Sequence, residues 1–564
     1  MSARWSGLLL GGLLVLLVGA CRAAPAPTPT PTRAPAPPAM LPTPTPVPPT
    51  PTPAPKAPTV LRANLGTEPT TLDPALVKDS PSVDVVRALF VGITNQTEDT
   101  GAVIPDLAER WTVSADGTGY TFTLRRDVKW TDGKSVTARD AEYGGLRTLD
   151  PKTASEYAYV PAGIIKGGED FNRGKADASQ VGIRAVDDWT ITYTLNYPAG
   201  FFPALASMWV LMPQPRWAIE QHKEKWIEPG NIVTNGPYLL RSWEHEKSLV
   251  LEKNPNYYDA PHVQIDRIEF VMVKEASTAL AMYEAGQLDT LYNLGVPLGE
   301  IDRVKKDPVL SKELYIAPRP ITYYYGFNVT KPPVDKALVR KALIASIDRQ
   351  GLIDNVLKGG QRPALTFTAP GNFGFVDGEK EGIGIPFNPD QAKRWLAEAG
   401  YPNGRGWPSD VVLMYNTSEG HKRIAEAISA MWKQHLNIDV KVVNQDWAVY
   451  LKTLSQDPPH IWRLGWGADY LDADNWMSVF LSDSGNNHTM WKNTRFDALV
   501  KQAAREQDPA KRLQLYKEAE RLLVQEDAVI APIYFYTTVQ LTKPYLKRTY
   551  SALVEQFKNW RIER

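Results

Sequence analysis

The strongest constraint on the fold is an alternation of strand-like and helix-like segments in the last third of the chain. Residues 411–415, 438–443 and 461–466 are short runs rich in apolar side chains, which are typical of buried strands. Between them lie residues 419–436, with apolar residues at helical spacing, and a second helical stretch that begins at Trp447. Because strands that alternate with helices pair in parallel through right-handed crossovers, we predict an α/β fold with a doubly wound sheet.

The ends of these strands carry candidate binding residues. His421 follows the strand at 411–415, and Asp469 follows the strand at 461–466. Ligands of doubly wound sheets bind beyond the carboxyl ends of the strands, so we expect both residues to face one crevice. A desolvated aspartate suits an ammonium group, and Arg463, six residues earlier, suits a carboxylate. These two charges fit a short peptide; alternatively, they pair with each other or with neighbours.

The first 58 residues have the composition of an export signal and a spacer. Residues 1–21 combine one basic residue, an aliphatic run and a terminal Gly-Ala-Cys, which predicts a lipoprotein signal peptide with a lipobox. Lipidation of Cys21, the only cysteine, would anchor the protein to the outer face of the cell membrane. Residues 22–58 are almost all Pro, Thr and Ala, which predicts an extended linker. The alternative is an ordinary secretory signal with an incidental cysteine.

The composition excludes some functions and leaves others open. Lys plus Arg and Asp plus Glu both total 63, so the chain lacks the basic field that nucleic acid attracts. Beyond the signal there is no run of 18 apolar residues, and the remaining length suggests two or three domains. The 17 tryptophans and 24 tyrosines suit either a core or a cleft that grips flat or extended ligands.

Local signals predict several further elements. Residues 120–124 and 265–273 alternate or are continuously apolar, which predicts strands. Thr137, followed by Asp140, resembles a capping box that opens a helix through Leu149. Helical spacing predicts one helix over 334–356, and Asn388-Pro389 caps another that ends at Gly400.

Two kinds of chemistry other than peptide binding are compatible with the residues around Asp469. Asp469 with Asp472 or Asp474 could form the carboxylate pair of a glycoside hydrolase, with Trp466 and Trp476 stacking on sugar. A metal site could be built from His460, Asp469, Asp472 and His488. Their spacing matches no metal motif, and the chain has no nucleophile elbow or phosphate loop, so neither alternative has positive support.

Several segments, in order along the chain, resemble one protein family. They are EPTTLDP (68–74), IPDLAERW (104–111), VKWTDGKSVTARDAEY (128–143), DPKTASEYAY (150–159), VTNGPY (233–238), TYYYGFNVTKPP (322–333), YNTSEGH (415–421), NQDW (444–447) and GWGADY (465–470). Together they resemble the extracytoplasmic solute-binding proteins of ABC importers, the dipeptide/oligopeptide/nickel-binding family (family 5). The likeness is greatest to the oligopeptide-binding proteins.

The resemblance implies a two-lobed, periplasmic-binding-protein-like fold (type II, or cluster C). An extra domain is inserted in the first lobe of this fold. The implied boundaries are residues 59–92, 217–321 and 537–564 for lobe I, 93–216 for the inserted domain, and 322–536 for lobe II.

The resemblance also implies ligand-binding residues. In similar proteins the aspartate that matches Asp469 holds the amino terminus of the peptide, and residues that match Arg463 and His421 hold its carboxylate. Trp466 and Gly467 would lie beside the peptide backbone. The remaining implied contacts are Trp447, Tyr157 and Ser80. The sequence departs from the family pattern at three positions: Lys78 replaces an acidic residue, Leu454 an arginine and Gly467 a cysteine. The first two changes bear on side-chain preference and ligand length, whereas the third matters little if only backbone groups of Gly467 are used.

These observations lead to one expected function. We expect a lipid-anchored, monomeric receptor that captures short peptides for an ABC importer, whose permease and ATPase are separate chains. We expect no catalysis, no cofactor or metal, and no nucleic-acid partner. The alternatives are a receptor for oligosaccharides or other solutes and, from a different class, a secreted glycoside hydrolase.

Overall fold

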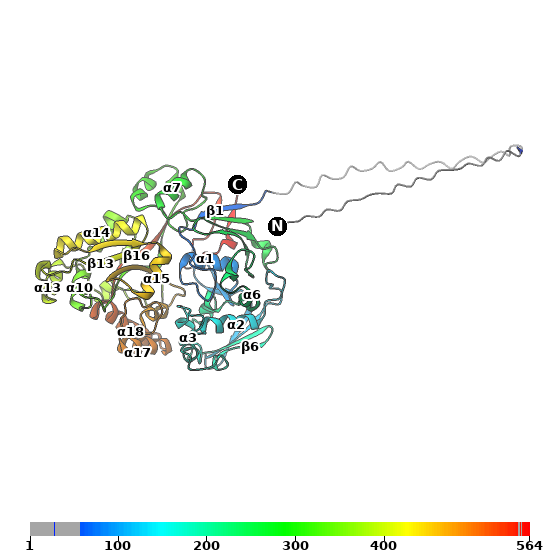
Figure 1. The fold of residues 1–564 in the computed structure, drawn as a ribbon, viewed down its shortest axis with the longest axis horizontal. Helices are drawn as coiled ribbons and strands as arrows, with labels where there is room; N and C mark the ends of the chain where they lie inside the picture. Colours follow the sequence, from blue (N-terminus) through cyan, green and yellow to red (C-terminus); the bar gives the residue numbers. More distant parts are fainter. Residues whose placement is uncertain (1–26, 29–56, 551–552, 554) are drawn as a thin grey trace, which may run out of the picture. The chain divides into compact units, whose positions relative to one another are not determined.

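The computed structural model describes residues 27–28, 57–550, 553 and 555–564. The predicted signal peptide, Cys21 and nearly all of the predicted linker therefore lie outside the described residues. Residues 57–564 form one compact unit, shown in Figure 1. Among the described residues, none of the helices is both long and apolar enough to cross a membrane.

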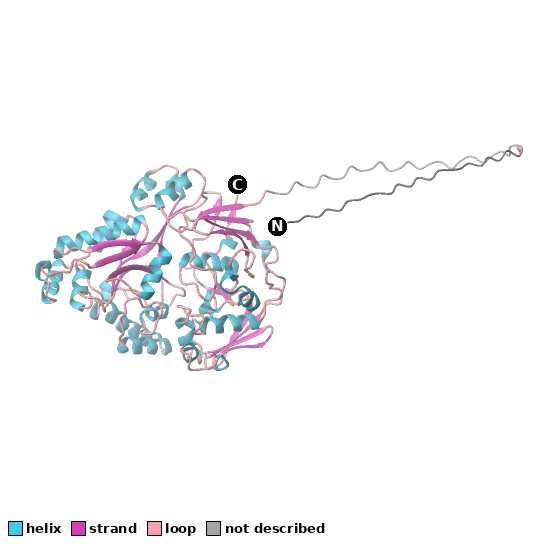
Figure 2. Cartoon of the chain, viewed as in Figure 1, coloured by secondary structure: helices cyan, strands magenta, loops and turns pink. Residues whose placement is uncertain are grey.

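A six-stranded sheet contains the segments that alternate in the sequence. Its order is β12-β16-β11-β15-β13-β14, and Figure 2 shows helices on its outer side. The bounds are β12 Arg362–Pro363, β16 Ile530–Leu541, β11 Leu314–Phe327, β15 Ile461–Gly467, β13 Val412–Asn416 and β14 Lys441–Gln445. The helices between the last three strands are α14, Glu419–Leu436, and α15, Trp447–Gln456.

The predicted parallel pairing holds for part of this sheet. β13 pairs in parallel with both β14 and β15, as predicted. β14 begins three residues later than the predicted strand at 438–443. β11 instead pairs antiparallel with β15 and with β16, so the sheet is mixed and parallel pairing is confined to the three strands of the predicted alternation. No local pattern in β11 encodes its direction, because its partners are more than 130 residues away in the chain.

The two long strands β11 and β16 connect this sheet to a second one. They pair from Leu314–Leu541 to Gly326–Ile530. Beyond the end of β16, Thr542 bridges to Thr290, which bridges in turn to Ala63 of β1. The second sheet has the order β1-β10-β9-β8. Its bounds are β1 Val60–Asn64, β10 Arg267–Val271, β9 Ser248–Lys253 and β8 Tyr238–Glu244.

A third sheet, of four strands, has the order β4-β5-β7-β6. Its bounds are β4 Ala108–Val113, β5 Gly119–Leu124, β7 Thr190–Thr194 and β6 Ile183–Asp187. β5 confirms the predicted strand, since alternate residues Tyr120, Phe122 and Leu124 are buried. The predicted capping box is also confirmed: the Asp140 carboxylate accepts the Thr137 backbone N–H at 2.8 Å at the start of α2, Ala138–Leu149.

One predicted helix is interrupted and another is confirmed. Residues 334–356 form α10, Ala337–Ala345, and α11, Arg349–Leu352, instead of a single helix. The break occurs because Asp348 turns to cap α11, accepting the Gly351 N–H at 2.8 Å. α13, Pro389–Glu398, begins as predicted, with the Asn388 side chain accepting the Gln391 N–H at 3.0 Å.

The other elements are short or lie between the sheets. The helices are α1 Ser80–Leu89, α3 Tyr159–Ile164, α4 Gly168–Asn172, α5 Phe202–Leu205, α6 Arg216–His222, α7 Ala276–Glu284, α8 Ile301–Lys306, α9 Leu310–Glu313, α12 Gly378–Glu381, α16 Ala473–Met477, α17 Thr494–Arg505 and α18 Pro509–Arg521. The strands are β2 Thr94–Gln96, β3 Val103–Pro105, β17 Leu546–Lys547 and β18 Arg561–Ile562.

Some tryptophans are packed in the core and others line a cavity. Trp130, Trp226, Trp432, Trp462, Trp476 and Trp560 are fully buried. Trp432 anchors α14 to α10 by donating to the Leu343 carbonyl at 3.0 Å. Trp209, Trp447 and Trp466 instead line a cavity. The aromatic content therefore serves both of the roles that the sequence left open.

Candidate ligand-binding site

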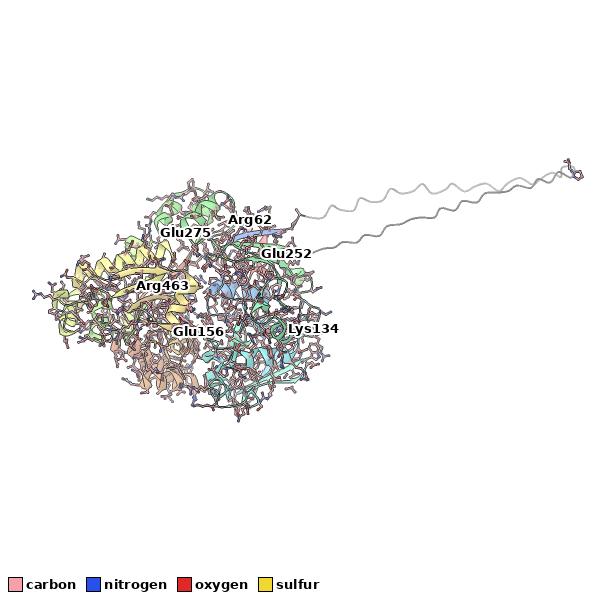
Figure 3. The ribbon with its side chains drawn as sticks, viewed as in Figure 1. Arg62, Lys134, Glu156, Glu252, Glu275 and Arg463 are labelled. Carbon is pink, nitrogen blue, oxygen red and sulfur yellow. The ribbon has the colours of Figure 1, made fainter. Side chains whose placement is uncertain are left out.

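A large cavity lies between the six-stranded sheet and the rest of the fold. Its volume is about 1200 Å³, larger than the roughly 300–1,000 Å³ of small-molecule pockets. The structure brings all eight residues proposed as ligand contacts to its wall: Ser80, Tyr157, His421, Trp447, Arg463, Trp466, Gly467 and Asp469. Figure 3 labels Arg463 on the six-stranded sheet and Glu156, another lining residue, on the facing part of the chain.

Asp469 is held rigidly just beyond the end of β15. Its backbone N–H donates to Asn475 Oδ1, and Asn475 Nδ2 donates to Asp469 Oδ2, both at 2.9 Å. Among the described residues, Oδ1 of Asp469 has no hydrogen-bond partner. Burial raises the pKa of Asp469 to about 6, against the lowering effects of Asn475 and the Arg87 charge. The site therefore offers a fixed carboxylate with one oxygen still able to accept.

The support for Asn475 comes from an ion pair outside the cavity. Asp472 caps α16 by accepting the Asp474 N–H at 2.9 Å. Arg512 of α18 binds both oxygens of Asp472, at 2.7 and 2.8 Å, and both side chains are largely buried. This pair fixes the start of α16 and hence the side chain that orients Asp469.

The same contacts argue against the two alternative chemistries. Asp472 is engaged by Arg512, and Asp474 accepts the Tyr470 hydroxyl at 2.8 Å, so neither faces the cavity with Asp469 as a hydrolase pair would. Within the part of the chain that the structure describes, no three metal-ligating side chains come together. The metal set of His460, Asp469, Asp472 and His488 is therefore not assembled.

β15 presents an open edge to the cavity. β13 pairs with β15 only at Ile461 and Trp462 among the described residues. The Tyr450 hydroxyl occupies the next position, accepting the Arg463 N–H at 2.9 Å and donating to its carbonyl at 2.6 Å. Residues 464–467 lie beyond it and line the cavity. Because two of them are Gly465 and Gly467, the backbone is accessible for pairing with an extended chain.

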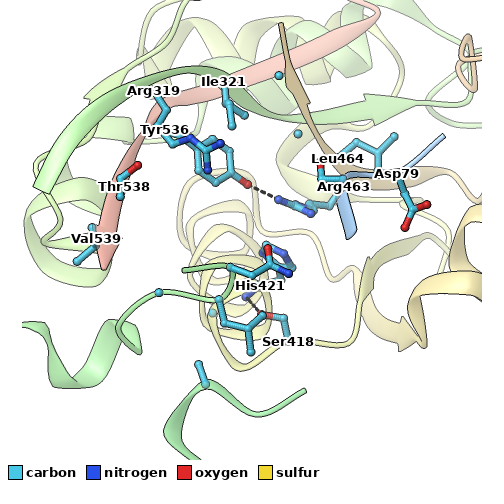
Figure 4. A pocket seen from close by; sticks show the side chains of 18 of the residues that line it. Asp79, Arg319, Ile321, Ser418, His421, Arg463, Leu464, Tyr536, Thr538 and Val539 are labelled. Atoms are coloured by element: carbon cyan, nitrogen blue, oxygen red, sulfur yellow. Dashed lines mark hydrogen bonds between the residues drawn. The ribbon is translucent and has the colours of Figure 1, made fainter. Parts of the chain in front are cut away.

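Arg463 gives another part of the cavity a positive charge, and Figure 4 shows it beside Tyr536 and His421. Arg463 donates to Asn416 Oδ1 at 3.0 Å and to the Tyr536 hydroxyl, and it lies over the Tyr323 ring at 4.5 Å. These contacts use two of its five N–H donors. Arg463 and Asp469 thus have separate partners, so the alternative that they pair with each other is wrong.

His421 lies beside Arg463 in the first turn of α14. Its backbone N–H donates to the Ser418 capping hydroxyl at 3.4 Å. Burial and the Arg463 charge lower the pKa of His421 well below its usual value, so its imidazole is neutral. Its buried Nδ1 has no partner among the described residues. This end of the cavity therefore combines one positive charge with an unused polar atom.

Contacts across the cavity hold its two sides together. Trp447 donates from Nε1 to the buried Asp79 carboxylate at 2.9 Å. The Tyr157 ring stacks on Trp466, with centroids 6.2 Å apart and planes 11° apart. Ser455 donates to Glu156 Oε2 at 3.0 Å. Glu156 also forms an ion pair with Lys78, one of the positions where the sequence departs from the family pattern.

Several residues that line the cavity were not predicted from the sequence. Asp84 and Arg87 share one face of α1 with Ser80, and that helical spacing could have revealed them. Arg319 and Tyr536 lie on β11 and β16, and no local signal predicts that these strands meet at the cavity.

Comparison with known proteins decides the family. Residues 102–488 match the family model of bacterial extracellular solute-binding proteins, family 5 Middle. The chain belongs to this family. As a family 5 protein it is an extracytoplasmic solute-binding protein with an α/β, two-lobed fold, and the relatives found are solute-binding proteins rather than enzymes. The domain boundaries given above for lobe I, the inserted domain and lobe II stay a proposal, and we use these lobe names below.

Individual relatives are similar over most of the chain. The oligopeptide-binding protein OppA of Bacillus subtilis is 38% identical over 499 residues, covering 87% of this chain and 90% of that protein. The Escherichia coli murein tripeptide-binding protein MppA superimposes with a TM-score of 0.84 at 33% identity, over 90% of this chain and 99% of that one. Haemophilus influenzae OppA in complex with the peptide RPPGFSPFR also gives 0.84, at 30% identity, over 90% and 100%.

The similarity depends on conformation. An unliganded, open form of MppA superimposes with a TM-score of only 0.61, although its identity to this chain is again 33%. The family 5 protein described here therefore has lobes arranged as in the peptide complex of H. influenzae OppA rather than as in the open form of MppA. The contacts of Trp447 and Tyr157 across the cavity agree with a closed arrangement.

Proposed function

We propose that this protein captures short peptides outside the cytoplasm, as a monomer, and presents them to the separate permease and ATPase chains of an ABC importer. The observation that carries the proposal is the open edge of β15, residues 464–467, which ends at the fixed carboxylate of Asp469. An extended peptide can pair with such an edge through its backbone, whatever its side chains. A free amino terminus then provides the cation that Asp469 needs.

The proposed contacts follow the length of the cavity. The peptide ammonium group donates to Oδ1 of Asp469, and the peptide backbone lies along Gly465, Trp466 and Gly467. The peptide carboxylate points toward Arg463, which retains three of five N–H donors after its bonds to Asn416 and Tyr536. His421, whose imidazole is neutral, offers a hydrogen bond beside Arg463 to the carboxylate of peptides of another length.

Residues from both sides of the cavity enclose the proposed peptide position. Tyr157 stacks on Trp466 and so covers one side of the proposed peptide position. Trp447 and Ser80 complete the rim near Asp79. Because these residues belong to different lobes, they meet only when the lobes close, which buries the ligand and creates the surface that a permease recognises.

We also propose that Cys21 carries a lipid and that residues 22–58 tether the protein to the membrane. The Gly-Ala-Cys sequence after an aliphatic run supports the lipidation, and the Pro-Thr-Ala composition supports an extended tether. The variant Cys21→Ala is expected to move the protein from the membrane fraction to the soluble fraction. Retention of that variant in the membrane fraction would contradict the lipid anchor.

Peptide affinity is expected to depend on pH through Asp469. The pKa of this carboxyl is about 6, and only its ionised form attracts an ammonium group. Affinity should therefore fall below about pH 6, toward tenfold per pH unit, and should also fall above the peptide's own amino pKa of about 8. Calorimetric titration of a tripeptide from pH 4.5 to 9 measures this profile. Asp469→Asn should remove the acidic limb, and a constant affinity between pH 7 and 5 would count against the proposal.

A receptor for oligosaccharides is the second candidate, because Trp209, Trp447 and Trp466 line the cavity. Tryptophan faces suit sugar rings, but Trp466 is already stacked by Tyr157. Titrating the purified protein with a pool of tri- to pentapeptides and with cello- and xylo-oligosaccharides separates the two functions. Peptide binding alone supports our proposal, and sugar binding alone replaces it.

A further inference from the structure

The end of the cavity around Asp469 carries more charge than one ammonium group requires. Three carboxylates and two guanidinium groups line it, and we call these residues the amino-terminal subsite: Asp84, Arg87, Arg319, Asp469 and Glu555. They come from α1, β11, the loop after β15 and the last ten residues of the chain. Only the folded, closed protein brings these parts together.

Arg319 lines the cavity from β11, next to the backbone segment that leads to Asp469, and its charge acts on Asp84. The carbonyl of the next residue, Pro320, accepts the Ala468 N–H at 3.2 Å, so β11 and the segment that leads to Asp469 are neighbours. Figure 4 shows the Arg319 side chain next to Tyr536, above the cavity. Among the described residues its guanidinium makes no hydrogen bond or ion pair, and its Nε is buried. Burying an N–H of a guanidinium without an acceptor is costly unless a ligand supplies one.

Two other charged groups of the subsite have opposite charges close by. Glu555 accepts from the buried Arg548 at 2.8 Å. Arg87 is close to the negative charges of Asp469 and Asp106. Asp106 is in turn close to the positive charges of Lys558 and Arg125. Because Glu555 is paired with Arg548 and Asp469 is close to Arg87, neither carboxylate is available to neutralise Arg319.

Asp84 is a weak counter-charge for Arg319. Its only hydrogen bond among the described residues is a long one, 3.4 Å, from the Tyr292 hydroxyl. Burial, together with the charge of Glu555, raises the pKa of Asp84 to about 7. At neutral pH this carboxyl is only partly ionised, and it does not reach ion-pair distance of Arg319.

A count of charges shows what a peptide amino terminus would change. With Asp84 ionised, the subsite and the partner of Glu555 hold three cations and three anions: Arg87, Arg319 and Arg548 against Asp84, Asp469 and Glu555. The peptide ammonium group adds one positive charge. One further carboxylate would restore neutrality inside the closed cavity, where an unbalanced charge is more costly than in open solvent.

We propose that the protein prefers peptides whose first residue has a carboxylate side chain, and that Arg319 binds this carboxylate. The inference rests on the proposed function, because it assumes that Asp469 holds the amino terminus. The side chain of the first residue starts at the carbon that bears the ammonium group, so it lies within reach of the groups around Asp469. Arginine suits this role because its planar fork can bind a carboxylate through two parallel hydrogen bonds.

Four tripeptides test the proposal: Glu-Ala-Ala, Gln-Ala-Ala, Lys-Ala-Ala and Ala-Ala-Ala. They are titrated calorimetrically into the purified full chain at pH 7.5, after unfolding and refolding to remove any bound ligand. Glu-Ala-Ala is expected to bind on the order of tenfold more tightly than the isosteric Gln-Ala-Ala. Arg319→Met should bring this ratio close to one while Ala-Ala-Ala still binds. Arg216→Met, a matched change at an exposed surface pair, should leave the ratio intact.

The outcomes separate failure of this inference from failure of the proposed function. Equal affinities for the Glu and Gln peptides, with Ala-Ala-Ala bound, would overturn the role of Arg319 alone. Tightest binding of Lys-Ala-Ala would assign selection to Asp84 and would also overturn it. If no tripeptide binds, the peptide-receptor function itself is wrong.

Discussion

Replacing Asp469 with asparagine is expected to reduce peptide affinity by roughly 30-fold or more. The substitution keeps the shape of the side chain and an acceptor for Asn475 Nδ2, so the local hydrogen bonds survive. It removes the charge that binds the ammonium group. Breaking one side of a desolvated, hydrogen-bonded charge pair costs about 2–5 kcal/mol in binding free energy. Titration of a tripeptide at pH 7 into both proteins measures the loss.

A matched control separates this effect from a general change in charge. Asp457 follows α15 and forms an exposed ion pair with Lys331, and its side chain is 80% exposed. Asp457→Asn removes the same charge without touching the cavity, and it should leave affinity unchanged. If Asp469→Asn binds a tripeptide as tightly as the unmodified protein, Asp469 does not hold the amino terminus.

Replacing Arg512 with methionine is expected to lower both stability and affinity. Arg512 binds both oxygens of Asp472, and the two side chains are only 13% and 9% exposed. Removing one partner leaves a buried carboxylate uncompensated, which costs about 3–5 kcal/mol in the free energy of unfolding. Asp472 caps the helix that carries Asn475, so the orientation of Asp469 should suffer too. Denaturant unfolding and tripeptide titration measure the two effects.

A second substitution identifies the cause of the stability loss. In the double variant Arg512→Met with Asp472→Asn, the buried charge is gone, while the asparagine oxygen can still accept the Asp474 N–H. We expect this variant to recover part of the lost stability. If the double variant is as unstable as Arg512→Met, or if Arg512→Met is fully stable, the uncompensated charge is not the cause.

Individual helices and their caps could be predicted from the sequence. Periodic segments such as 419–436 and caps such as Asn388 decide their own structure from a few neighbouring residues, and the structure has them within a residue or two of the predicted positions. The antiparallel placement of β11 is different, because its partners β15 and β16 lie far away in sequence. The break before α11 was missed because the capping of Asp348 overrides the apolar spacing around it.

The residues of the candidate site likewise include some that the sequence predicted and some that it could not predict. Asp469 and His421 follow strands of the alternating unit, so topology alone predicted that they would face one cavity, and both do line it. Resemblance to a family added Trp447, Tyr157 and Ser80. Arg319 and Glu555 carried no signal, since they reach the cavity only when strand β11 and the end of the chain fold against it. The charges that the side chains of a peptide would meet in the cavity are therefore set by tertiary structure and not by local sequence.

The most direct test of peptide capture is to change the ligand instead of the protein. Ala-Ala-Ala and its N-acetylated form would be titrated into the purified protein after removal of bound ligand by unfolding and refolding. Acetylation removes the ammonium charge and leaves the rest of the backbone able to pair with β15. We predict that the free peptide binds and that the acetylated peptide binds at least tenfold more weakly, because Asp469 would then face a neutral amide. Equal binding of the two peptides would contradict the central role of Asp469 in capturing an amino terminus.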